Sequence, residues 1–132
     1  MIVDDWSSWT APWTITLLSS IGYFLLWIQV TLWHKRGKFH LKLMWAPVIV
    51  LPVAALIGIV TLFVQDSWFS WVQLIVSTSA IWLGIIGTSF HLKSIGKRTG
   101  GYTIENFMTG PPFVLPLLIS LFGTLNLLAI LL

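Results

Sequence analysis

The chain alternates between long uncharged stretches and short charged connections. Four windows contain no Asp, Glu, Lys or Arg, and they cover residues 11–33, 43–65, 67–90 and 106–132. Each window exceeds the roughly 20 residues that an α-helix needs to cross about 30 Å of hydrocarbon. Backbone groups in lipid must bond within their own segment, so each window is expected to be helical. The pattern predicts spans over about 11–33, 43–65, 67–91 and 110–132, in one domain covering 1–132, with short loops at 34–42 and 92–109.

A water-soluble helical bundle is the alternative to this interpretation. It would require a polar stripe along each helix, and residues 48–60 offer none. Charged residues make up only 8% of the chain, whereas soluble domains carry roughly 25%. The sequence therefore predicts an all-α integral membrane four-helix bundle.

The charged residues predict how the bundle is oriented. All seven Lys and Arg residues fall in the first and third connections, and three of the four acids, Asp4, Asp5 and Asp66, fall on the opposite side. Basic loops are retained in the cytoplasm, so we expect both termini to be non-cytoplasmic, in a bacterial inner (cytoplasmic) membrane. The basic charge then serves topology and attraction to lipid headgroups, and no nucleic-acid partner is expected.

Tryptophan and small residues refine this picture. Most of the nine tryptophans fall near the ends of the predicted spans, where indole rings prefer the headgroup level. Small residues let neighbouring helices approach closely, so a compact bundle with the third span at its centre is expected. The Asn126 amide is expected to form an interhelical hydrogen bond. The residues predicted to pack the helices are Gly58, Ala80, Gly84, Gly87, Thr88, Gly123 and Asn126.

Two histidines are candidate cofactor ligands. His34 ends the first span and His91 ends the third, and both helices run in the same direction, so the two side chains can meet at one depth. Paired imidazoles bind haem iron, the magnesium of a chlorophyll-type pigment or a transition metal. The alternative is that each histidine caps a helix C-terminus and lies among the headgroups. No cofactor is required by the sequence, and no separate metal site is predicted.

The third connection is the most irregular part of the chain. Tyr102, Glu105, Asn106 and Phe107 follow a Gly100–Gly101 turn and form a candidate surface for recognising a partner. No nucleophile–base arrangement accompanies them, and the chain contains no cysteine. We therefore expect no catalytic residues and no enzymatic activity.

The sequence leaves two candidate functions open. No Asp, Glu, Lys or Arg lies inside a span, which disfavours ion-coupled transport. The first function is a non-catalytic accessory subunit of a larger membrane complex, for example in respiratory or photosynthetic energy conversion, which braces larger subunits or shields cofactors and lipids. The second is a small haem-, pigment- or quinone-binding membrane module, or the membrane anchor of an enzyme.

Overall fold

The computed structural model describes residues 7–132 and contains helices and connecting turns over that range. Asp4, Asp5 and Trp6, which the sequence places before the first span, lie outside it. The helices are α1 (Ala11–Arg36), the 3₁₀ helix η2 (Lys42–Met44), α2 (Trp45–Val64), α3 (Ser67–Arg98), α4 (Ile104–Thr109) and α5 (Val114–Leu131). Four segments, α1, η2 with α2, α3 and α5, are long and apolar enough to cross a membrane, which confirms the predicted four-helix all-α bundle.

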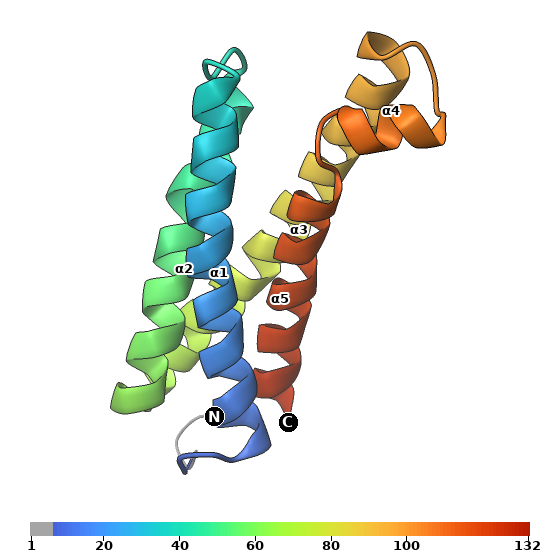
Figure 1. Ribbon diagram of the computed structural model, residues 1–132. Coiled ribbons are helices and arrows are strands. Elements are labelled where there is room, and N and C mark those ends of the chain that lie inside the picture. The colour runs from blue at the N-terminus through green and yellow to red at the C-terminus, as the bar shows by residue number, and fades with distance from the viewer. Residues whose placement is uncertain (1–6) are drawn as a thin grey trace.

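The four long helices form two antiparallel pairs. Helix α1 packs along α2, and α3 packs along α5, with further contacts between α1 and α5 and between α2 and α3. The pairs lie close together near the start of α1 and the end of α5, and they separate toward the opposite end (Figure 1). The expectation that the third span is central is wrong, because α1 and α3 lie diagonally and barely touch.

Glycines determine how closely the two helices of each pair approach one another. A Cβ atom added to Gly84 of α3 would collide with the Pro116 carbonyl and the Ser120 backbone of α5. A Cβ atom at Gly58 of α2 would likewise collide with the Ser20 hydroxyl of α1. Only glycine lets the backbones come this near, which allows dispersion contacts that lipid cannot replace.

The third connection is more helical than the sequence suggests. Helix α3 continues to Arg98, and α4 forms a short helix within the predicted 92–109 loop. Helix α5 begins at Val114 rather than at Gly110, because a residue that precedes proline disfavours the helical region. Gly110 is accordingly extended, with ψ of −170°. The chain thus leaves α4 in an extended conformation at Gly110 and returns to helical backbone angles at Phe113, immediately before α5.

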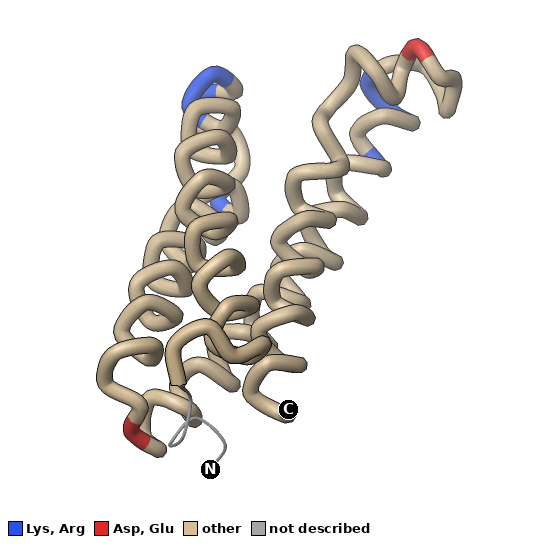
Figure 2. The backbone as a smooth tube through the Cα atoms, turned by 60° about the horizontal axis from the view of Figure 1, so that its bottom comes forward, with Lys and Arg blue, Asp and Glu red and all other residues tan. Residues whose placement is uncertain are grey.

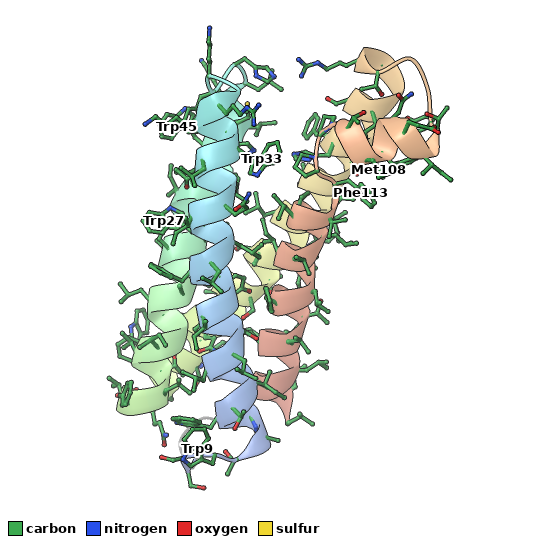
Figure 3. The ribbon with its side chains drawn as sticks, viewed as in Figure 1. Trp9, Trp27, Trp33, Trp45, Met108 and Phe113 are labelled. Atoms are coloured by element: carbon green, nitrogen blue, oxygen red, sulfur yellow. The ribbon has the colours of Figure 1, made fainter. Side chains whose placement is uncertain are left out.

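Charge and aromatic residues are distributed as a membrane requires. Lys and Arg gather at the end that carries the two longer connections, whereas the start of α1 and the end of α5 lie at the other end (Figure 2). Large apolar side chains such as Leu18, Phe63 and Ile75 point outward and are more than half exposed. Trp9 lies at the terminal end, while Trp33 and Trp45 lie at the loop end (Figure 3). This outer surface suits a lipid solvent rather than water.

Candidate functional site

A cleft lies between the two helix pairs at the loop end of the bundle. It has a volume of about 630 Å³, within the roughly 300–1,000 Å³ of small-molecule and cofactor sites. Its walls come from α1, α3, the segment from Gly37 to Pro47 and the start of α5. The walls are mostly apolar, so the cleft suits a lipophilic ligand with a small number of polar contacts.

Both candidate histidines line this cleft from opposite helix pairs. His34 comes from α1 and His91 from α3, and each side chain is half-buried. The structure thus brings together two imidazoles that are 57 positions apart in the sequence (91 − 34).

Each imidazole is held by a backbone carbonyl. His34 Nδ1 lies 2.7 Å from the Met44 carbonyl oxygen, and His91 Nδ1 lies 2.9 Å from the Pro112 carbonyl oxygen. A carbonyl only accepts hydrogen bonds, so Nδ1 carries the proton in both rings. In the neutral ring Nε2 then keeps its lone pair for a ligand. Metal-ligating histidines are usually oriented in this way, with the other ring nitrogen donating to a carbonyl or carboxylate.

The sequence around α5 explains why the Pro112 carbonyl is available. In a continuous helix this oxygen would accept a hydrogen bond from the backbone N–H of residue 116. Residue 116 is proline, which has no N–H to donate. Pro112 also lies before the first residue of α5, so its carbonyl oxygen takes no part in the helix and accepts from His91.

The mouth of the cleft is cationic. Arg36 and Arg98 both line it, one from each helix pair, and no Asp or Glu is among its lining residues. Two guanidinium groups without a carboxylate nearby favour an anionic group on the ligand, because arginine forms paired hydrogen bonds to carboxylates and phosphates.

Aromatic rings border the cleft on both sides. Trp33 lies on the side of α1 that faces the α3–α5 pair (Figure 3), and Phe90 lines the opposite wall. Each ring is 43% exposed, so each has surface left to contact a ligand. The Arg36 guanidinium lies 5.9 Å from the Trp33 ring centroid, within the range of a cation–π contact. Flat aromatic ligands pack well against such walls.

The four predicted recognition residues lie outside the cleft and mostly stabilise their own connection. Asn106 Nδ2 donates to the Gly101 carbonyl at 2.9 Å, and the Tyr102 and Phe107 ring centroids are 6.0 Å apart. Glu105 is exposed. The structure therefore leaves Glu105 and the exposed part of Tyr102 as the accessible members of this set.

The predicted packing residues lie in the helix interfaces. Ala80, Gly84, Gly58, Gly123 and Asn126 are buried, while Gly87 and Thr88 are half-buried. The Thr88 hydroxyl donates to the Gly84 carbonyl within α3. Gly87 also lines the cleft. Asn126 lies beside Tyr23 of α1, the side chain placed for the expected interhelical hydrogen bond, and its Oδ1 atom has no partner within hydrogen-bond distance among the described residues.

No protein-family model matches the chain, and neither does any curated protein or solved structure. The residues themselves therefore carry every functional inference. Within residues 7–132, no group of three or more His, Cys, Asp or Glu side chains is placed to hold a bare metal ion.

Proposed function

We propose that this chain is a small membrane module that binds haem between its two helix pairs, where His34 and His91 would hold the iron. One observation carries the proposal: two histidines from opposite walls of one cleft each donate Nδ1–H to a backbone carbonyl and keep Nε2 for a ligand. An imidazole nitrogen with this support is a typical axial ligand of haem iron.

The donor set favours haem over a bare metal ion. A protein-bound metal ion usually takes three or four side-chain ligands, and no such group occurs in the described residues. Haem supplies four nitrogen ligands of its own and needs at most two from the protein. The pair His34 and His91 meets that requirement.

The donor set also favours haem over a quinone. The oxygens of a quinone ring accept hydrogen bonds, so a quinone site needs donors. The neutral His34 and His91 rings already use their proton on a carbonyl and present an acceptor to the cleft. An acceptor nitrogen can bind a metal centre, whereas it forms no hydrogen bond with a quinone oxygen, which is also an acceptor.

The charge at the mouth supports the same ligand. Haem is apolar over most of its ring and carries two carboxylate groups on one edge. The apolar walls suit the ring, and Arg36 and Arg98 suit the carboxylates. Trp33 and Phe90 offer ring surfaces for the porphyrin face.

We further propose that the module has no catalytic activity of its own and serves as an accessory subunit or anchor of a larger membrane complex. Its basic loops would face the cytoplasm and its termini the opposite side, as in a bacterial inner membrane protein. Membrane lipids would cover the outward apolar faces that no partner subunit covers.

An optical titration tests the proposal. The protein is purified in mild detergent, placed in lipid nanodiscs and titrated with ferric haem, with empty nanodiscs as the blank. A saturable Soret band at one haem per chain is expected. Because even supporting residues around a metal change affinity by about 10–100-fold, His34→Ala and His91→Ala should each weaken binding at least about tenfold.

His40→Ala is the matched control. His40 also borders the cleft, but its side chain is exposed and its Nδ1 atom is hydrogen-bonded to the Gly37 carbonyl oxygen. We assign it no ligand role. This variant should bind haem as the unmodified chain does. Haem binding that is no stronger than the nanodisc blank would refute the proposed function.

A further inference from the structure

A second polar region lies deep in the half of the bundle near the chain termini. Its side chains are each no more than 2% exposed, and each has at least one nitrogen or oxygen without a hydrogen-bond partner among the described residues. We call this set the polar layer. It consists of Thr16, Ser19, Tyr23, Gln73, Ser77 and Asn126.

Packing contacts bring these side chains together from three helices. The Tyr23 hydroxyl of α1 lies beside the Asn126 side chain of α5. A Cβ atom added to Gly123 of α5 would lie 2.9 Å from the Ser77 carbonyl of α3. Asn126 follows Gly123 by one helical turn, and Gln73 precedes Ser77 by one turn. Tyr23, Gln73, Ser77 and Asn126 therefore occupy one level of the bundle.

Most of the unpaired buried side-chain atoms among the described residues belong to this layer, and the two others are Trp27 Nε1 and Thr31 Oγ1 of α1. Nearby hydroxyls of the same kind are satisfied within their own helices, where Ser20 donates to the Thr16 carbonyl and Thr61 to the Ile57 carbonyl. The Thr16, Ser19 and Ser77 hydroxyls do not form such bonds. Lipid offers no hydrogen bonds, so polar groups left unpaired at this depth carry a large free-energy cost.

We infer that the polar layer binds a cluster of ordered water molecules inside the bundle. Water both donates and accepts hydrogen bonds, and it is the usual partner of buried polar groups that the protein itself leaves unpaired. The layer likewise presents acceptors, such as Asn126 Oδ1, together with a donor-only group, Gln73 Nε2. A metal cation fits less well, because the amide N–H₂ group would repel it and no carboxylate lies within the spans.

This water site is separate from the cleft. Along α1, the apolar residues Leu26 and Val30 lie between the polar layer and His34. Along α5, Ile119 lies between Asn126 and the end of the helix that borders the cleft. These residues belong to one buried apolar cluster with Leu51 and Ala80. These apolar residues lie between the polar layer and the two histidines of the cleft, and neither proposal depends on the other.

Radiolytic labelling tests the inference. X-rays convert bound water to hydroxyl radicals, which oxidise neighbouring side chains, and mass spectrometry locates the products. In the full chain in nanodiscs, Tyr23 should be labelled well above Leu51 once both rates are divided by the rates in the unfolded chain. The two residues are equally buried, since both are 0% exposed. Equal corrected labelling of Tyr23 and Leu51 would overturn the inference.

A variant provides the second measurement. In Gln73→Leu/Asn126→Leu the layer loses amide groups that would hold water, so Tyr23 labelling should fall at least about threefold. Exposed Tyr102 should be unchanged and serves as the internal control. Unchanged Tyr23 labelling in a folded variant would contradict a water cluster held by these amides. If the variant does not fold, the comparison of Tyr23 with Leu51 in the unmodified chain decides.

Discussion

Removing the two arginines at the cleft mouth should weaken haem binding by a calculable amount. Arg36 and Arg98 line the cleft from opposite sides, and neither meets a carboxylate there. A hydrogen bond to a charged group contributes about 1.5–3 kcal/mol when protected from water. Both arginines are exposed, so screening by water reduces each contribution to about 1 kcal/mol. The double variant Arg36→Gln/Arg98→Gln should therefore lose about 2 kcal/mol, which is about 30-fold in Kd.

The assay is the Soret titration in nanodiscs, with charge-matched controls. Lys38→Gln/Lys93→Gln removes the same charge from the same end of the molecule, but neither lysine lines the cleft. This control should change Kd by less than about threefold, because exposed charges at a distance are screened by salt. Haem dimethyl ester, which lacks the carboxylates, should bind the unmodified chain about as weakly as haem binds the arginine variant. The reasoning fails if the two double variants bind haem equally well, or if the ester binds as tightly as haem.

Two further predictions concern packing and orientation. Gly84→Ala should lower the free energy of unfolding by about 2 kcal/mol, because overpacking against the α5 backbone costs about 1–3 kcal/mol and outweighs the gain in helix propensity. A thermal melt in detergent measures this loss of stability. A variant as stable as the unmodified chain would refute the close α3–α5 contact. Gly37→Ala is its control, because a Cβ atom there would come no nearer than 3.3 Å to any atom, and that nearest atom is the flexible end of the Met44 side chain. The chain has no cysteine, so single-cysteine variants report topology directly. A membrane-impermeant maleimide added to intact cells should label Ser7→Cys and not Lys38→Cys, and labelling of both from one side would contradict the proposed orientation.

The sequence was sufficient to predict the helices because a membrane imposes one dominant constraint. Uncharged windows of the required length, such as 43–65, have no alternative in lipid to forming helices. Helix ends were less predictable where local chemistry competes, as at Gly110, where the following prolines delay α5 until Val114.

The arrangement of the helices was predicted less well. A stripe of small residues indicates that a helix has a close neighbour but does not identify it. The stripe on α3 meets α5 at Gly84 and at Gly123, so α3 is one side of a ring of four helices rather than its centre. Partner choice depends on side-chain fit across the whole interface, which a single helix pattern does not contain.

The candidate site was likewise only partly predictable from the sequence. Equal depth along parallel helices was enough to predict that His34 and His91 lie at one end of the bundle, where both line the cleft. The carbonyls that orient them come from Met44 and Pro112, in segments whose path depends on the tertiary fold. The separation of the helix pairs, which creates the cleft, is a property of packing along their full length and has no local signal.

Electron paramagnetic resonance of the ferric haem complex tests the central claim most directly, because the spin state of the iron reports its axial ligands. The unmodified chain should give the low-spin signal of iron with two imidazole ligands, and His34→Ala and His91→Ala should each convert the bound haem to a high-spin signal. A high-spin signal from the unmodified chain, or a low-spin signal that survives in both single variants, would contradict ligation by this pair.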